Sequence, residues 1–306
     1  PGILVARRSL FTNRVPSEPG GGTVTYVSGA EHRYVDDPVQ REEGGTPAIL
    51  GSIRAGLVFQ LKDAIGAEEI LAREHAFIQR AIRAWDALPQ LRILGNPRAK
   101  RLGIVSLMVR HGEGFLHHDY VVALLNDLFG IQARGGCSCA GPYGHRLLGI
   151  GPERSRAFEA EVLRGSGGIK PGWVRLGFNY FFSPEDLDYV IEAVSLIARE
   201  GWKLLPAYRF DPARGLWTHR EHPEPAVLRL DELSYATGRL QYRARRATEP
   251  ESALSGYLEE ARALLGGAAE RLADPLPDDP PLPEGFEALR WFPLPREAAE
   301  ALRADG

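Results

Sequence analysis

The two cysteines of this 306-residue chain, Cys137 and Cys139, lie one residue apart in the glycine-rich stretch RGGCSCAGPYG. A cysteine attacks only as the thiolate, and neighbouring cationic groups favour that form. Arg134 lies five residues before Cys139, and His145 lies six residues after it. The glycines give the backbone the freedom that a mobile loop needs. These residue types allow a nucleophilic cysteine on a mobile loop.

Two other interpretations of the same stretch stay open at this point. The cysteines could bind a metal together with a histidine such as His117, His118 or His145. A C-x-C pair supplies only half of a tetrahedral site, however, and the chain has no second cysteine pair, so we predict no metal. The cysteines could also be incidental small residues of a turn, and spacing alone does not separate this interpretation from a nucleophile.

A phosphate-binding candidate lies at the start of a predicted helix. Thr46 follows Gly44 and Gly45 and precedes Pro47, which suits the first helical position. We therefore expect Thr46 to be the N-cap. Free backbone amides, a hydroxyl group and the helix dipole together suit a phosphate, although a simple cap would have the same residues.

A carboxylate-binding candidate lies on a predicted strand over residues 173–178. Val174, Leu176 and Phe178 alternate onto one face, and Arg175 points to the other. An arginine fork matches a carboxylate bidentately, so Arg175 is either a substrate clamp or a solvated surface residue.

Periodicity indicates the elements that must position these residues. Strands are expected at 3–6, 23–28, 91–94, 103–109, 131–134 and 173–178. Helices are expected at 47–65, 67–88, 118–129 (closed by Gly130), 184–200 (capped by Ser183) and 252–265. The acidic, proline-rich stretch 274–285 is expected to be an extended linker. The order of the elements after residue 90 is typical of a small α/β sandwich with helices on one face of its sheet.

Composition limits the class of protein. The chain is 44% hydrophobic and 25% charged, as is ordinary for a globular protein. A net charge of −3 gives no electrostatic reason to expect nucleic acid or a membrane surface as partner. No stretch is apolar enough to span a membrane, and two cysteines make no disulfide framework. We therefore expect a cytoplasmic protein.

Three motifs, in order, resemble the C-terminal part of class V aminotransferases. They are REEGGTP (41–47), RGGCSCAGP (134–142) and KPGWVRLGFNYF (170–181), and they are most similar to the cysteine desulfurase and selenocysteine lyase branch. The resemblance covers about residues 1–205. It implies the α/β architecture of fold type I enzymes that use pyridoxal 5'-phosphate, and four regions follow from it. These are a remnant of the cofactor-binding large domain with its sheet (1–66), a connecting helix (67–90), the small α/β domain (91–205) and a family-specific extension with a proline-rich linker (206–306).

The resemblance also implies a role for the cysteines. Cys139 matches the nucleophile that takes sulfur from cysteine, leaving a persulfide and alanine. Histidine is common in the family where this chain has Cys137 and Ser138, so Cys137 could serve instead or relay the persulfide.

The remaining implied roles concern binding. Arg175 matches the residue that binds the α-carboxylate of the substrate, with Arg134 as the motif arginine beside the loop. Gly45 and Thr46 match the residues that reach the phosphate of the cofactor held by a partner subunit. The resemblance thus implies a homodimer with shared active sites and a possible sulfur-acceptor protein.

One element of the family pattern is absent. The Schiff-base lysine follows a histidine in the family, and none of the four lysines here does so (Lys62, Lys100, Lys170 and Lys203). We therefore expect a fragment that is inactive alone. The alternatives are a class V aminotransferase or lyase acting on another amino acid, and a non-catalytic binding module that uses the C-x-C loop for metal.

Overall fold

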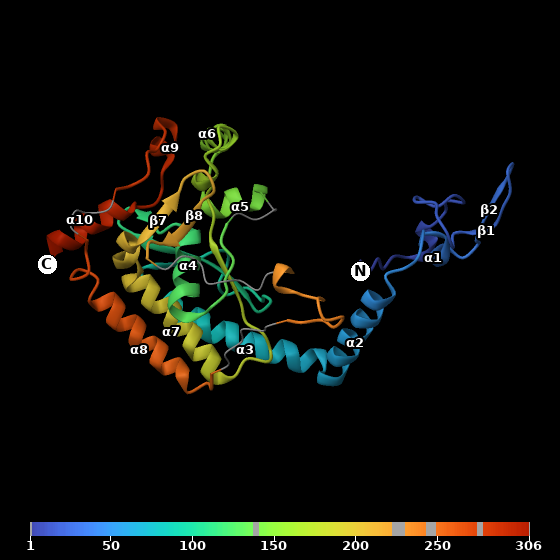
Figure 1. The fold of residues 1–306 in the computed structure, drawn as a ribbon, viewed down its shortest axis with the longest axis horizontal. Helices are drawn as coiled ribbons and strands as arrows, with labels where there is room; N and C mark the ends of the chain where they lie inside the picture. The colour runs from blue at the N-terminus through green and yellow to red at the C-terminus, as the bar shows by residue number, and fades with distance from the viewer. Residues whose placement is uncertain (1, 137–140, 222–229, 243–248, 274–277, 306) are drawn as a thin grey trace. The chain divides into compact units, whose positions relative to one another are not determined.

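The computed structural model describes residues 2–136, 141–221, 230–242, 249–273 and 278–305 (Figure 1). It divides into two compact units, Pro1–Ile70 and Leu71–Gly306. The strands are β1 Val24–Val27, β2 His32–Tyr34, β3 Leu91–Ile93, β4 Ile104–His111, β5 Gly114–Phe115, β6 Val174–Gly177, β7 Tyr208–Asp211 and β8 Leu216–His219. The α-helices are α1 Pro38–Arg41, α2 Ile49–Ile65, α3 Ala67–Asp86, α4 His118–Phe129, α5 Gly141–Leu148, α6 Pro152–Leu163, α7 Pro184–Glu200, α8 Ala253–Gly266, α9 Glu284–Leu289 and α10 Pro295–Asp305. Short 3-10 helices are η1 Arg8–Leu10, η2 Gly167–Ile169, η3 Gly201–Ala207 and η4 Leu230–Glu232.

The first unit contains a two-stranded antiparallel sheet of β1 and β2. The strand expected at 23–28 is confirmed as β1. The strand expected at 3–6 is wrong, because these residues have no neighbouring strand among the described residues and their large side chains stay exposed. An apolar run becomes a strand only where a ladder partner exists.

Helix α2 carries large apolar side chains around its whole circumference and buries none of its residues. The expectation that Thr46 is its N-cap is wrong. The helix begins at Ile49, and Ala48 is its N-cap residue. The amide of Ile49 donates a hydrogen bond to the carbonyl of Pro47 at 2.8 Å.

The sheet of the second unit has β4 at its centre. Strands β3 and β6 flank β4 on either side and β5 also pairs with it, all antiparallel. The strands expected at 91–94, 103–109 and 173–178 are confirmed. The strand expected at 131–134 reduces to a single bridge at Arg134.

Helices α4 and α7 cover the face of this sheet that carries Val105, Leu107 and Val174. Their ends follow the sequence. The side chain of Ser183 caps α7 in a capping box, and Gly130 ends α4 in the left-handed conformation. A smaller apolar cluster lies on the opposite face and includes Leu147 and Leu148 of α5. The main helical layer is on one face, as expected.

The extension 206–306 belongs to the same core. The helix expected at 252–265 is confirmed as α8, which packs on α7 and α4. The β7–β8 hairpin, α9 and α10 were not expected. Residues 278–283, the described middle of the proline-rich stretch, form no helix or strand. Large aromatic side chains of this extension are buried: Tyr208, Phe210, Trp217, Phe286 and Phe292.

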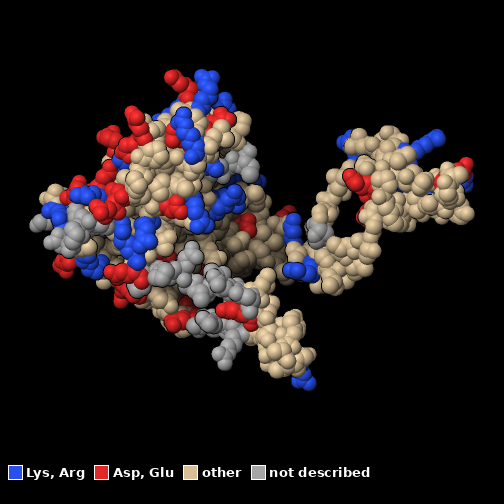
Figure 2. Space-filling view, turned by 45° about the horizontal axis from the view of Figure 1, so that its top comes forward, with Lys and Arg blue, Asp and Glu red and all other residues tan. Residues whose placement is uncertain are grey.

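Charged side chains of both signs are interspersed over the visible face of the second unit (Figure 2). This mixed surface agrees with the small net charge of the chain. Among the described residues, no helix has both the length and the apolar character that a membrane crossing requires.

Candidate functional site

The residues that lead into the cysteine loop pair with β6. Arg134 and Arg175 exchange two backbone hydrogen bonds, of 3.2 and 2.7 Å, and the amide of Trp173 donates to the carbonyl of Gly136 at 3.1 Å. The segment therefore extends the sheet beyond β6 as far as Gly136. Residues 137–140, which include both cysteines, lie outside the described residues.

The two arginines form a directly opposed cross-strand pair. Because they exchange both backbone hydrogen bonds, their side chains emerge on the same face of the sheet. Both are exposed, and neither guanidinium has a hydrogen bond or ion pair within the described part of the chain. Like charges in this arrangement destabilise a sheet unless an anion lies between them. The geometry suits a carboxylate, and Arg175 lies on the outer face, as the alternation predicted.

Glycines at the base of the loop are required by space. A side chain at Gly135 would collide with the carboxylate of Asp119. One at Gly172 would lie 2.7 Å from the carbonyl carbon of Gly136 and 2.8 Å from Cε1 of His118. Gly136 itself has φ of +114°, which side chains disfavour. The backbone of the loop base therefore packs directly on the first residues of α4.

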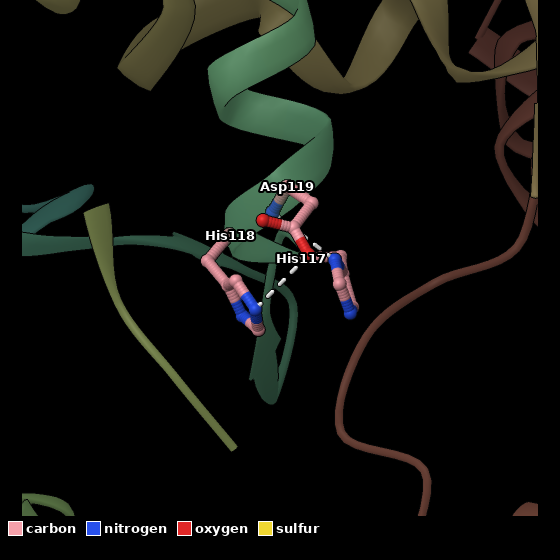
Figure 3. Close-up of side chains that lie close together, drawn as sticks. All are labelled: His117, His118 and Asp119. Carbon is pink, nitrogen blue, oxygen red and sulfur yellow. Dashed lines mark hydrogen bonds and ion pairs between the residues drawn. The ribbon is translucent and has the colours of Figure 1, made fainter. Parts of the chain in front are cut away.

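Two adjacent histidines and an aspartate begin α4 (Figure 3). Nδ1 of His117 accepts the amide of Asp119 at 3.1 Å, so its Nε2 carries the proton and donates to the carbonyl of Gly168 at 3.0 Å. Burial, together with the charge of His118, lowers the pKa of His117 well below its ordinary value. His117 is therefore a neutral core residue with both ring nitrogens engaged.

His118 is also buried. Its Nε2 lies 3.3 Å from Oδ2 of Asp119 (Figure 3), whereas Nδ1 has no hydrogen-bond partner within the described chain. Its ring stacks on that of His117, with centroids 4.3 Å apart, and is nearly parallel to that of Trp291. The described structure thus places an oriented imidazole under the base of the cysteine loop.

These three residues resemble a metal cluster in distance but not in chemistry. Their potential ligand atoms lie within 4.8 Å of one another. His117 has no free lone pair, because Nδ1 accepts an amide and Nε2 is protonated. His118 and Asp119 alone are fewer ligands than a protein metal site normally uses. His145, the other histidine suggested as a ligand, is exposed on α5.

The candidate phosphate residues belong to the first unit. The amide of Gly45 donates to the carbonyl of Gly21 at 2.9 Å, and Gly45 has φ of +85°. Thr46 is exposed. The loop therefore offers the hydroxyl of Thr46 to a ligand, but the amide of Gly45 is already used. The arginine pair belongs to the second unit.

Sequence reasoning missed part of this arrangement. His117 and His118 were considered only as metal ligands, although two histidines before a helix that starts with Asp119 also indicate a cap. The contact of Trp291 with His118 joins residues far apart in the sequence, and no local pattern indicates it.

Comparisons with known proteins agree with the motifs. The sequence model of the family described as aminotransferase class-V matches residues 2–190. A cysteine desulfurase of Cronobacter sakazakii is 34% identical over 141 residues, which are 46% of this chain and 33% of the relative. A cysteine desulfurase of Serratia proteamaculans is 32% identical over 141 residues, which are also 46% of this chain and 33% of the relative. The chain thus spans about a third of the length of these relatives.

A solved structure supports the same assignment. The apo structure of a cysteine desulfurase from Thermococcus onnurineus has a TM-score of 0.51 and 28% identity, covering 63% of this chain and 42% of that one. The α/β fold of part of a fold type I enzyme is therefore confirmed. The chain belongs to the aminotransferase class-V family.

Proposed function

We propose that this chain serves a cysteine desulfurase-like enzyme that uses pyridoxal phosphate. The observation that carries the proposal is the pair Arg134 and Arg175 at the base of the loop that holds both cysteines, whose guanidinium groups have no partner among the described residues. A carboxylate site beside a thiol is what the removal of sulfur from an amino acid requires. The names of the relatives from Cronobacter and Serratia support the same reaction.

The arginines bind and orient the substrate in this proposal. Arg175 binds the α-carboxylate, because its side chain is exposed on the face of the sheet opposite Val174 and Leu176. Arg134 adds a second positive charge on that face. A carboxylate bound here also removes the repulsion between the two guanidinium groups, so binding stabilises the sheet edge.

The thiolate of Cys139 acts as the nucleophile, with Cys137 as the alternative or the relay. It attacks the sulfur of the substrate cysteine, so that an S–S bond forms on the enzyme and the substrate C–S bond breaks. Cysteine and the enzyme thiol thus become alanine and an enzyme persulfide. The carbon is reduced and the two sulfurs are oxidised, so no external oxidant is needed.

Pyridoxal phosphate, when bound, supplies the electron sink for cleavage of the C–S bond. The described residues fit it only in part. Thr46 offers a hydroxyl to a phosphate, but Gly45 has no free amide, and no lysine follows a histidine. We expect borohydride to trap no lysine of this chain on pyridoxal phosphate, and a peptide labelled at Lys62, Lys100, Lys170 or Lys203 would contradict this.

The assembly follows from the same proposal. Residues 1–66 belong with the cofactor-binding domain, and 91–205 form the small domain. Gly45 and Thr46 serve the cofactor of a partner subunit in a cytoplasmic homodimer. The persulfide passes to a sulfur-acceptor protein.

The test uses protein expressed from its complete gene with pyridoxal phosphate present. Alanine and sulfide released from cysteine are measured for the natural protein and for Cys139→Ser, Cys137→Ser and Arg175→Met. We expect Cys139→Ser to abolish release and Arg175→Met to raise KM about tenfold or more, since a charge-assisted bond is lost. Arg110→Met, another exposed strand arginine, is the control and should change little.

Two results would refute the proposal. Full release by a variant with both Cys139→Ser and Cys137→Ser would exclude either cysteine as the nucleophile, whereas full release by Cys139→Ser alone would assign that role to Cys137. Release from another amino acid in preference to cysteine would favour a class V aminotransferase or lyase instead, because the arginine pair would bind any α-carboxylate equally well.

A further inference from the structure

The extension that follows the family match reaches the base of the cysteine loop. Trp291 lies about a hundred residues beyond residue 190, where the match ends. Its ring is nearly parallel to that of His118, at 8° and a centroid separation of 5.7 Å, and it stacks on His117 at 5.3 Å. Through this ring the C-terminal segment contacts the first residues of α4.

Trp291 is fixed from two sides. Its indole Nε1 donates to the carbonyl of Ile169 at 3.1 Å. Its own carbonyl accepts the amide of Phe115 at 3.2 Å, which adds a hydrogen bond beside β5. These two hydrogen bonds therefore fix the position of the ring against the histidines.

His118 contacts both Trp291 and the base of the loop. Its ring is nearly parallel to the indole, its Nε2 lies 3.3 Å from Oδ2 of Asp119, and its Cε1 would lie 2.8 Å from a side chain at Gly172. The spaces beside Gly135 and Gly172 are filled by Asp119, His118 and Gly136. A displacement of His118 or Asp119 therefore changes the space on which the backbone of the loop base rests.

We propose that Trp291, acting through His118 and Asp119, is a positioning residue that holds the base of the cysteine loop. The extension is then a working part of the loop site and not an appended module. The catalytic meaning of this proposal rests on the proposed function, whereas the positioning itself can be measured without cofactor, substrate or turnover.

The chain provides a clean test, because both of its cysteines lie in the loop and any thiol label reports on that loop alone. Trp291→Phe keeps a stacked ring and removes the Nε1 hydrogen bond. Trp85→Phe makes the same change in the main core, where the indole of Trp85 donates to Ile191 at 3.2 Å. Hydrogen exchange of residues 132–136 and 173–175 and the rate of alkylation by iodoacetamide are measured for both variants.

We expect Trp291→Phe to increase the rate of hydrogen exchange at the loop base about fivefold. The loss of one buried hydrogen bond shifts the equilibrium between closed and locally open states by about this factor. Its alkylation profile against pH should also shift. Trp85→Phe should lower the overall stability by a similar amount but leave the exchange rate of the loop base and the alkylation profile unchanged. Asp119→Asn, which keeps the shape and removes the charge beside His118, should resemble Trp291→Phe.

The proposal is overturned if Trp291→Phe and Trp85→Phe change exchange equally, because that would make Trp291 an ordinary core residue. It is also overturned if neither Trp291→Phe nor Asp119→Asn alters exchange or alkylation. Loss of desulfurase activity with an unchanged loop base would refute the positioning and leave the proposed function intact.

Discussion

Helices α2 and α4 have similar apolar content but use it differently. In α2, Leu57 and Phe59 are 58% and 56% exposed, and no residue of the helix is buried. In α4, by contrast, Leu124 and Leu125 are buried almost completely against the sheet and α7. A helix that is apolar all round is typical of a protein interior. The second unit therefore contains its own core, whereas no residue of α2 is buried within the described structure.

Truncation gives the largest expected effect. We expect residues 67–306 to unfold cooperatively, because the sheet, α4, α7 and the extension share one core. A chain that ends at residue 205 should lose the cooperative transition, since it lacks the buried aromatic side chains of the β7–β8 hairpin and α9. Thermal unfolding followed by tryptophan fluorescence measures both. Cooperative unfolding of the shorter chain would show that the extension is a separate module.

A matched pair of substitutions compares the two helices directly. Leu124→Ala should lower the free energy of unfolding by about 3 kcal/mol, because it opens a cavity in the core. Leu57→Ala should change it by less than about 0.5 kcal/mol, since Leu57 is exposed. Guanidinium unfolding followed by circular dichroism reports on the helices of both units. Equal losses would mean that α2 is buried in solution, for example in a dimer.

The pH dependence of stability gives a smaller effect. Burial keeps His117 neutral, so the unfolded chain takes up a proton below about pH 6.5 that the folded chain does not. Stability should therefore fall with decreasing pH, by at most about 1.4 kcal/mol per unit from this residue. Desolvation also lowers the pKa of His111, so this residue contributes to stability with the same sign.

The substitution His117→Gln separates the contribution of His117 to the pH dependence of stability from that of His111. It should flatten the fall in stability between about pH 6.5 and 5.5, where the unfolded histidine titrates, and His111→Gln should flatten it less. Denaturation midpoints measured across this range provide the comparison. A slope that His117→Gln leaves unchanged would mean that His117 is not held neutral.

Local signals account for what the sequence predicted. Helix α7 has Ser183 as its cap and apolar residues at helical spacing, so its bounds could be read closely. The outward position of Arg175 followed from alternation along β6. Residues 3–6 have the composition of a strand, yet a strand also needs a partner, which composition does not specify.

The rest of the site depends on contacts between distant residues. The pairing of Arg134 with Arg175 joins residues about forty positions apart, and no local pattern specifies it. In the extension only the helix at 252–265 and the proline-rich linker were expected, whereas its buried aromatic residues also complete the core. Trp291 and His118 meet only through this packing.

The most direct test of the proposed function is a mass spectrum of the loop itself. Trypsin cleavage after Arg134 and Arg146 releases residues 135–146, which contain both cysteines. Protein expressed from its complete gene is incubated with pyridoxal phosphate and cysteine, then alkylated and digested. We predict one additional sulfur atom on Cys139, much less of it in Arg175→Met, and none when alanine replaces cysteine. Consumption of cysteine with no additional sulfur on this peptide would contradict the account.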